Sequence, residues 1–249
     1  MIKINRTPPP VELTPLVVAS ETAKFKASKA VVWNKPYIKT ALQAMSHGKC
    51  CYCECDVSTG SSYMEVEHFH DKKTYPNEVL LWGNLLPSCK RCNGKKGTYD
   101  TKANPIVNPT VDYPQKHMIL KKCFRYKSKD PKGQRTIDAL DLNNQERAVT
   151  ERYQIKQVLT QRLKSIMLMA RLIGQGNLVR QISKRLQEEM TQLLQECQSD
   201  KKYTAVKVTT VLNSMNYKKA RKVMKRFKLW SRKMDTLETR MTSYKYDTV

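Results

Sequence analysis

The chain has 249 residues, of which 46 are Lys or Arg and 22 are Asp or Glu, so its formal net charge is +24 at pH 7. Positive charge in this excess repels itself unless a polyanion neutralises it, and nucleic acid is the usual polyanionic partner of strongly basic proteins. A generically basic protein without such a partner is the alternative. No run of about 18 apolar residues occurs, which excludes a membrane-spanning helix.

The first 36 residues are expected to run extended, because prolines at positions 8–10 and 15 accompany few periodic apolar positions. They contain no apolar stretch of the kind found in secretory signal peptides. We therefore expect a cytoplasmic protein, whose eight cysteines are metal ligands or buried thiols. Pro36 then begins a short predicted helix that ends at Gly48.

The strongest motif is a pair of Cys-x-x-Cys turns, formed by Cys50 with Cys53 and by Cys89 with Cys92. Each turn offers two thiolates at the spacing typical of a tetrahedral zinc site. The 35 residues between the turns are about twice the ~15 to 20 of a plain four-cysteine zinc ribbon. The turns should thus clamp a larger unit, and four thiolates leave no open position, so the zinc ion should be structural. Cys51 and Cys55 lie close by but do not have this spacing.

The segment between the cysteine turns has a strand, strand, helix pattern. Residues Tyr63 to His68 read as a strand, with Glu65 and Glu67 on one face and His68 on the other. Val79 to Trp82 is the candidate second strand, and Cys92 to Lys96 should open a helix. This order is that of a ββα-metal finger.

The order Cys-x-x-Cys, Glu-His, Asn-Leu-Leu, Cys-x-x-Cys-Asn and Lys-Gly resembles the signature of HNH endonucleases, with an asparagine where many members have the last histidine. Flanking residues resemble, more narrowly, the nuclease subunits of Septu and retron-associated antiphage systems; they are Lys49–Glu54, Glu67–Phe69, Tyr75–Pro76, Trp82–Leu86 and Asn108–Pro109. The resemblance covers about the first half of the chain and implies a helical extension beyond residue 115. It also implies bacterial antiphage defence with an ATPase subunit (PtuA-like) as partner and, in retron systems, a reverse transcriptase and its RNA–DNA product as regulators.

Phosphodiester hydrolysis needs an activated water and a cation that holds the scissile phosphate. His68 is the candidate general base, because a neutral imidazole accepts a proton near its ordinary pKa of about 6.5. The resemblance implies that Glu67 and Asn93 bind Mg²⁺ or Mn²⁺, and both have the oxygen donors that a hard ion prefers. Glu65 is the rival carboxylate. Asn84 completes the predicted catalytic set and is expected to hold its loop by side-chain hydrogen bonds to the backbone.

Other polar residues around the motif are less specific. His70 is either a second substrate contact on the face of His68 or a solvated loop residue, and the following Asp71–Lys73 departs from the proline and lysine usual in the family. Four basic residues near the predicted helix start are expected to attract phosphate without reading base sequence. They are Lys90, Arg91, Lys95 and Lys96.

The remaining chain is expected to be mainly helical. Residues 104–132 contain four prolines and predict a long irregular connection with a strand at Met118–Phe124. Apolar residues at helical spacing then predict helices from Ile155 to Ile173, from Leu178 to Cys197 and from Tyr217 to Met234, the last surrounded by basic residues. These stripes are typical of a bundle core. Cys123 and Cys197 are expected to be buried as small apolar residues.

The predicted fold class is α+β, mainly α: an extended segment 1–36, an HNH nuclease domain 37–115 with its four-cysteine zinc site, a connection 116–145 and a helical partner-binding region 146–249. The predicted function is a metal-dependent endonuclease with DNA as the favoured substrate. An RNA endonuclease, for example of tRNA, is one alternative. A non-catalytic, zinc-containing adaptor that binds nucleic acid is the other, and it is favoured if His68 is dispensable.

Overall fold

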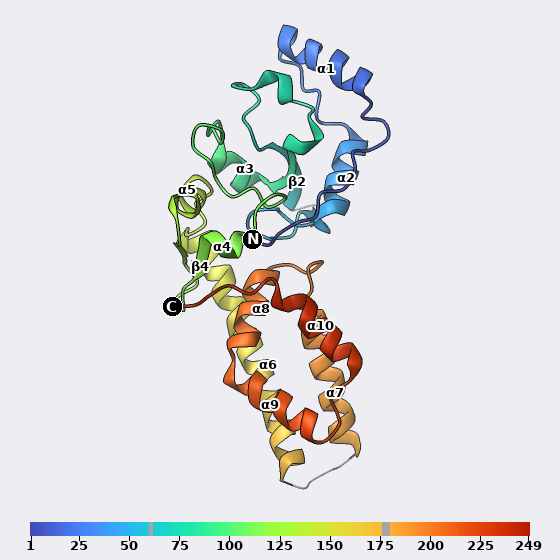
Figure 1. Ribbon diagram of the computed structural model, residues 1–249, viewed down its shortest axis with the longest axis vertical. Coiled ribbons are helices and arrows are strands. Elements are labelled where there is room, and N and C mark those ends of the chain that lie inside the picture. The colour runs from blue at the N-terminus through green and yellow to red at the C-terminus, as the bar shows by residue number, and fades with distance from the viewer. Residues whose placement is uncertain (60–61, 176–179) are drawn as a thin grey trace. The chain divides into compact units, whose positions relative to one another are not determined.

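A computed structural model describes residues 1–59, 62–175 and 180–249, and the chain divides into two compact units (Figure 1). The first unit comprises residues 1–118 and 126–144, and the second comprises residues 119–125 and 145–249. Each unit has its own core and is described separately.

The first unit combines short helices with small antiparallel sheets. Its helices are α1 (Pro15–Ser28), α2 (Pro36–Ser46), α3 (Lys90–Lys96), α4 (Pro114–His117) and α5 (Pro131–Ala139), with 3-10 turns η1 (Pro76–Glu78) and η2 (Trp82–Asn84). One sheet has the order β1-β2-β3, made by Ser58–Thr59, Ser62–His68 and Leu85–Cys89. The other pairs β4 (Met118–Leu120) with β5 (Tyr126–Ser128), and the boundary between the units falls in this hairpin.

The centre of the first unit is the antiparallel pair β2 and β3. Its register places His68 opposite Leu85 and Met64 opposite Cys89. Helices α2 and α3 contact this pair and lie on either side of β2 (Figure 1). Every residue of β3 is consequently buried. The predicted order of two strands and a helix is confirmed, although the second strand lies later in the chain than predicted.

The prediction that residues 1–36 are extended is wrong for residues 15–28, which form α1. The Thr14 hydroxyl accepts a hydrogen bond from Val17 N at 3.3 Å, and Pro15 occupies the first helical turn. Proline is favoured there because its missing N–H has no partner in the first turn anyway. Pro15 thus marks a helix start and not an extended segment.

The predicted second strand at Val79–Trp82 is also wrong, since the strand that pairs with β2 begins at Leu85, after the predicted strand has ended. Pro76 begins a tight turn in which Val79 N donates to Pro76 O at 3.4 Å, and Leu81 N donates to Glu78 O at 3.2 Å. Val79 and Leu80 are buried without being part of a sheet. A short apolar run does not distinguish a buried turn from a buried strand.

The connection around residues 104–132 is more regular than predicted. Helices α4 and α5 each begin with proline, and the Asp130 carboxylate caps α5 by accepting from Gly133 N at 2.7 Å. A Cβ atom at Gly133 would lie 2.1 Å from the His117 carbonyl oxygen, so this close approach requires glycine. The predicted strand at Met118–Phe124 is confined to Met118–Leu120.

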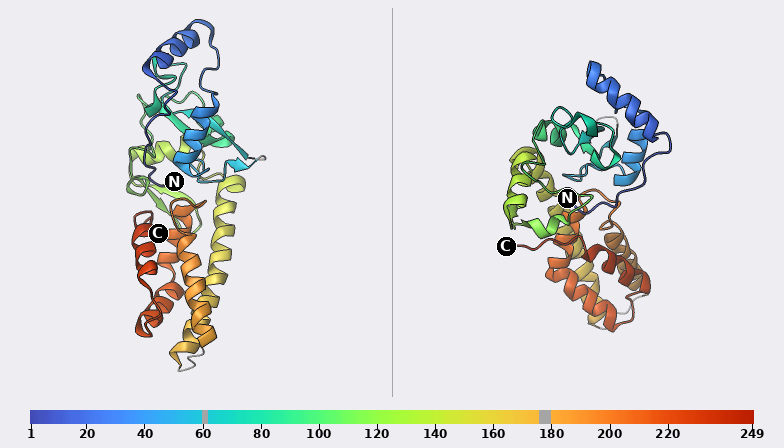
Figure 2. Two further views of the ribbon diagram at one scale, coloured as in Figure 1. Left: turned by 90° about the vertical axis from the view of Figure 1, so that its right-hand side faces the viewer. Right: turned by 45° about the horizontal axis from the view of Figure 1, so that its top comes forward.

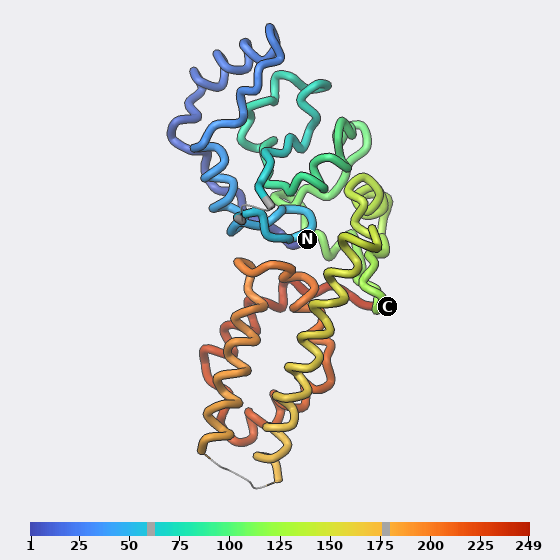
Figure 3. Tube along the Cα trace, turned by 180° about the vertical axis from the view of Figure 1, so that it is seen from behind, coloured from blue at the N-terminus to red at the C-terminus, as the bar shows by residue number. Residues whose placement is uncertain are grey.

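The second unit is helical. A π-helical turn η3 (Gln145–Val149) precedes α6 (Thr150–Gly174), α7 (Arg180–Gln195), α8 (Thr204–Asn213), α9 (Met215–Arg226) and α10 (Arg232–Thr242). These helices run alongside one another (Figure 2), and α7 returns along α6 (Figure 3). Their buried stripes share one apolar core, which includes Leu163, Ile166, Leu193, Ala220 and Met224. No helix in the described parts of the chain is long and apolar enough to cross a membrane.

The C-terminal helices differ from the predicted single helix Tyr217–Met234. The helical path breaks at Lys228, whose φ of 56° is left-handed, and Ser231 then caps α10 by accepting from Met234 N at 3.3 Å. Helix α8 was not predicted, because its sequence is rich in β-branched residues that favour strands. Leu178, at the predicted start of the second helix, lies outside the described residues.

The two isolated cysteines behave differently. Cys197 is fully buried in the core of the second unit, as predicted. Cys123 is exposed, so its predicted burial is wrong. It lies in the tight turn of the β4–β5 hairpin, where Phe124 takes the buried place with a left-handed φ of 62°.

Candidate metal centre and active site

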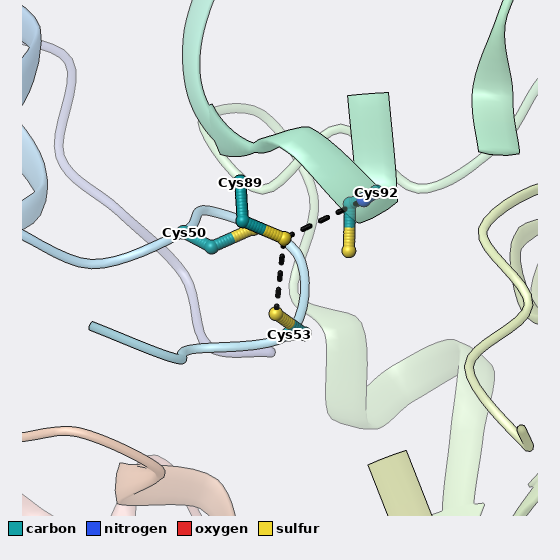
Figure 4. Close-up of side chains that lie close together, drawn as sticks. All are labelled: Cys50, Cys53, Cys89 and Cys92. Carbon is teal, nitrogen blue, oxygen red and sulfur yellow. Dashed lines mark hydrogen bonds between the residues drawn. The ribbon is translucent and has the colours of Figure 1, made fainter. Parts of the chain in front are cut away.

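The four cysteines of the two Cys-x-x-Cys turns form one cluster (Figure 4). Cys50 and Cys53 lie in the turn after α2, Cys89 ends β3 and Cys92 lies in the first turn of α3. Their sulfur atoms all lie within 4.8 Å of one another. The Cys89 sulfur also caps α3, accepting from Cys92 N at 3.4 Å. The cluster predicted from spacing alone is confirmed.

The donor set fits a structural zinc ion. In a tetrahedral site with Zn–S bonds of about 2.3 Å, sulfur atoms lie about 3.8 Å apart, and the Cys53 and Cys89 sulfurs lie 3.8 Å apart. Burial raises the pKa of the Cys50 thiol, but hydrogen bonds from neighbouring thiols outweigh this and hold its pKa well below the ordinary value. Burial raises the pKa of Cys51 and keeps it a thiol. The guanidinium of Arg91 lies 3.8 Å from the Cys92 sulfur, where its charge offsets that of the thiolates.

Glu67 and Lys96 form a buried ion pair. The carboxylate oxygen Oε1 of Glu67 lies 2.7 Å from Lys96 Nζ and accepts a hydrogen bond from the Tyr52 hydroxyl at 3.3 Å. Burial nevertheless raises the pKa of Glu67 to about 7, against the opposing effect of Lys96. Lys96 also donates to the backbone carbonyl of His68 at 2.8 Å. This pair therefore ties α3 to β2 directly beside the candidate base.

His68 is held as a neutral imidazole. It is only 4% exposed, and its ring packs edge-on against Trp33 with centroids 4.9 Å apart. Burial, together with the charge of Lys72, lowers the pKa of His68 to about 3. Its Nε2 atom lies 3.0 Å from the carbonyl oxygen of Val79. A neutral ring can only donate to a carbonyl, so Nε2 carries the proton and the lone pair lies on Nδ1.

Asn93 contacts Glu65 and not Glu67. The Asn93 amide nitrogen donates to Glu65 Oε2 at 2.7 Å, which joins the middle of α3 to the middle of β2. Both side chains are half-buried, so water reaches them. No hydrogen bond joins Asn93 to Glu67 among the described residues. Glu65, which the sequence offers as the alternative carboxylate to Glu67, is thus the one that lies beside Asn93.

Asn84 fixes the loop between β2 and β3, and its predicted hydrogen bonds to the backbone are confirmed. Its amide nitrogen donates to the carbonyls of His70 and Glu78 at 3.0 and 3.1 Å, and its oxygen accepts from His70 N at 2.6 Å. Sequence reasoning missed Arg6, which donates to the carbonyls of Trp82 and Leu85 at 2.7 and 2.6 Å. Local sequence gives no signal for this clamp, because its partners lie more than 70 residues away.

His70 lies beyond the end of β2 and so does not share the strand face of His68. Its Nδ1 atom lies 2.6 Å from Glu78 Oε2, and Lys102 pairs with the other oxygen of the same carboxylate. Asp71 is buried and accepts hydrogen bonds from Lys73 N and Thr74 N at 3.1 Å each. This turn forms where the sequence departs from the proline and lysine usual in the family.

The four basic residues predicted to bind nucleic acid are mostly engaged within the protein. The prediction is wrong for Lys96, which is 3% exposed because it neutralises Glu67. Arg91 is half-buried beside the cysteine cluster, and Lys95 lies 3.5 Å from Asp141. Lys90 is exposed. The first unit thus offers little unneutralised charge around α3.

Similarity to known proteins covers both units. The Septu protein PtuB of Bacillus thuringiensis is 44% identical over 216 residues, which are 86% of this chain and 83% of that protein. The chain belongs to the Septu PtuB family. The Septu protein PtuB of Bacillus mycoides (strain KBAB4) is 30% identical over 192 residues, covering 59% of this chain and 64% of the relative. No family model matches the chain.

Membership of the PtuB family bears on the second unit as well as the first. The resemblance visible in the sequence covered about the first half of the chain, whereas the PtuB alignment spans 216 residues. That length exceeds the whole stretch 1–144, so the alignment includes part of the helical second unit. The helices are therefore part of what this chain shares with PtuB.

Proposed function

We propose that this protein is a metal-dependent endonuclease of the HNH type that acts as the effector subunit of a Septu antiphage defence system. The observation that carries the proposal is the placement of His68, Asn84 and Asn93 on one small unit, β2–β3–α3, clamped by the four-cysteine cluster. The 44% identity to a Septu protein supports the defence role. DNA is the favoured substrate. RNA is the alternative, because these residues would act on the phosphate, which DNA and RNA share, and not on the sugar.

His68 would accept the proton of the attacking water at Nδ1. The Val79 carbonyl holds Nε2–H and so orients the ring and its lone pair. The low pKa keeps the ring neutral at physiological pH, and it also makes His68 a weaker base than an exposed imidazole. Asn84 and Arg6 would act as positioning residues, since their hydrogen bonds fix the turn that leads into β3.

Glu65 and Asn93 would hold the catalytic metal ion. The resemblance implies Glu67 as the carboxylate ligand in place of Glu65. Glu65 and Asn93 fit a hard cation, because both side chains carry an oxygen donor, are open to water and are neighbours, with the Asn93 amide nitrogen 2.7 Å from Glu65 Oε2. Glu67 is neutralised by Lys96 and fits less well. A bound Mg²⁺ or Mn²⁺ would neutralise charge on the scissile phosphate and on the leaving oxygen.

The cofactors and partners follow from the same proposal. Zinc would be structural in the four-cysteine cluster. The helical residues 146–249 would bind the ATPase subunit PtuA and, if the system is of the retron type, respond to a reverse transcriptase and its RNA–DNA product. Such a complex would work in the cytoplasm.

One observation favours the second candidate, a non-catalytic adaptor that binds nucleic acid. His68 is 4% exposed and packs on Trp33, as a structural histidine would. In that case His68 would stabilise the first unit and would not touch water or phosphate during a reaction.

Cleavage by a His68→Gln variant decides between the two. Glutamine can still donate to the Val79 carbonyl but has no ring nitrogen to accept a proton. We expect the zinc-loaded full chain, assayed with its ATPase partner and Mg²⁺ on plasmid DNA and on total RNA, to lose about 10² to 10⁴ in rate. The His70→Gln variant, which changes the neighbouring histidine, should cut at nearly the wild-type rate.

Equal cleavage by wild type and His68→Gln, at equal zinc content, would remove His68 from the reaction, and binding without cleavage by either protein would favour the adaptor. Cleavage of RNA while the plasmid stays intact would support the endonuclease and show that its substrate is RNA and not DNA.

A further inference from the structure

Unneutralised positive charge is concentrated on helix α9 and the turn that follows it. Residues 215–233 contain nine Lys or Arg and no Asp or Glu. The second unit as a whole has 26 basic and 9 acidic residues, a net charge of +17 out of the +24 of the chain. The charge that predicts a polyanionic partner therefore belongs mainly to this unit.

The buried face of α9 decides which basic residues point outward. Tyr217, Ala220 and Met224 are buried, and α9 packs against α6 through this face. Residues four apart share one face of a helix, so the opposite face presents a row of basic side chains about 6 Å apart along the axis. We call this row the outer stripe; its members are Lys218, Lys222 and Arg226, and all three are exposed.

The acidic residues of α10 neutralise only one flank of α9. Glu238 accepts from Arg221 at 2.7 Å, and Asp235 lies 3.3 Å from Lys225. Within residues 1–59, 62–175 and 180–249, no carboxylate pairs with any member of the outer stripe. Its charge is thus available to a ligand.

This arrangement costs stability in the absence of a ligand. Lys218 with Lys222, and Lys222 with Arg226, are like charges at the i,i+4 spacing, each destabilising a helix by about 0.2–0.5 kcal/mol. Lys218 also lies near the helix N-terminus, where the helix dipole disfavours a cation. An ordinary solvated face mixes acids with bases, whereas no carboxylate of the described residues offsets the repulsion here, and a bound polyanion would relieve it.

We propose that the outer stripe of α9 binds the phosphodiester backbone of nucleic acid. Lysine and arginine contacts of this kind hold the backbone without reading bases. The basic side chains around α3 are the alternative. Their charge is largely neutralised by Glu67, Asp141 and the cysteine cluster. The inference rests on the proposed function only in taking nucleic acid as the ligand, and it does not require that the chain cleaves.

The test is the salt dependence of binding by a Lys218→Gln, Lys222→Gln, Arg226→Gln triple variant of the full, zinc-loaded chain. The probes are a labelled 20-base-pair DNA duplex and single-stranded RNA of one of its strands, without Mg²⁺, between about 50 and 200 mM salt. Each phosphate contact contributes about 0.7 to 0.9 to the slope of log affinity against log salt, so the slope should fall by about 2 to 3 and the affinity at ~150 mM by about tenfold or more. The melting temperature should stay the same or rise.

A matched control removes the same charge from other exposed positions of the second unit, Lys164→Gln, Arg171→Gln and Arg185→Gln. This control should keep most of the affinity. Equal losses in both triple variants, or none in the α9 variant, would overturn the proposal, as would loss of ATPase-subunit binding with nucleic-acid binding intact. A loss for both probes supports recognition of the shared phosphate chemistry, and a loss for one identifies the ligand. Failure of the nuclease would appear only in the His68 cleavage assay.

Discussion

The two units bury different kinds of residue. Of the polar or charged residues that are buried in the described chain, eleven belong to the first unit and three to the second. Buried charge and hydrogen-bonded side chains stabilise a fold only when fully partnered, so the first unit depends on its thiolates and on pairs such as Glu67 with Lys96. The second unit depends on a continuous apolar core. Specific chemistry is therefore expected from the first unit, and its stability should be the more sensitive to single polar changes.

The largest expected effect is the loss of a cysteine from the metal cluster, compared with the loss of the buried cysteine in the apolar core of the second unit. Cys89→Ser removes a thiolate from the cluster and should lose zinc and unfold the first unit, because binding of structural zinc contributes about 10–16 kcal/mol in zinc fingers. Cys197→Ser makes the same change in the apolar core, where burial raises the pKa of the thiol to about 12 and keeps it protonated. It should keep zinc and cost about 1–3 kcal/mol. Zinc content and hydrogen exchange of the full chain measure both.

In the Cys89→Ser protein, amides of β2, β3 and α3 should lose protection, while those of α6 and α9 remain protected. If all helices of both units lose protection together, the two units are one folding unit, and the comparison drawn above fails.

A smaller effect is expected at the buried ion pair. Lys96→Met leaves the Glu67 carboxylate buried without its cation, which typically costs about 3–5 kcal/mol. Lys95→Met is the matched control, because Lys95 is exposed and lies 3.5 Å from its acid, so its removal should cost less than about 1 kcal/mol. Chemical unfolding of zinc-loaded protein at pH 8 measures the difference. Adding Glu67→Gln to Lys96→Met should restore part of the loss, and a double variant as weak as the single would show that the pair is not the cause.

Local signals in the sequence were enough for the metal cluster and for much of the helical unit. The spacing of Cys50, Cys53, Cys89 and Cys92 places two thiols on each of two tight turns. This spacing is typical of zinc sites and can be recognised in the sequence alone. Likewise, the stripe from Ile155 to Ile173 predicts α6, because one apolar face repeats over many turns.

Contacts between distant segments could not be predicted in the same way. Lys96 reads as one of several surface lysines, and only the packing of α3 on β2 brings it to Glu67. The sequence offers both Glu65 and Glu67 as partners of Asn93, and only the tertiary structure shows that the contact is with Glu65. The turn at Val79 was missed since burial of a turn and burial of a strand leave the same apolar pattern.

The smallest expected effect is a pH dependence specific to the first unit. Burial lowers the pKa of His68 to about 3 in the folded chain, so the unfolded chain binds more protons below about pH 6.5. The contribution of neutral His68 to stability is therefore complete above about pH 6.5 and is lost as the pH falls toward 3. Between pH 7.5 and 5.5 the wild type should lose about 1.4 kcal/mol more than His68→Gln in chemical unfolding of zinc-loaded protein. The exposed His47, replaced by Asn to suit its left-handed φ of 53°, should leave the wild-type slope unchanged. Parallel pH profiles for wild type and His68→Gln would mean that His68 is protonated equally in both states, and that the buried, neutral imidazole does not exist in solution.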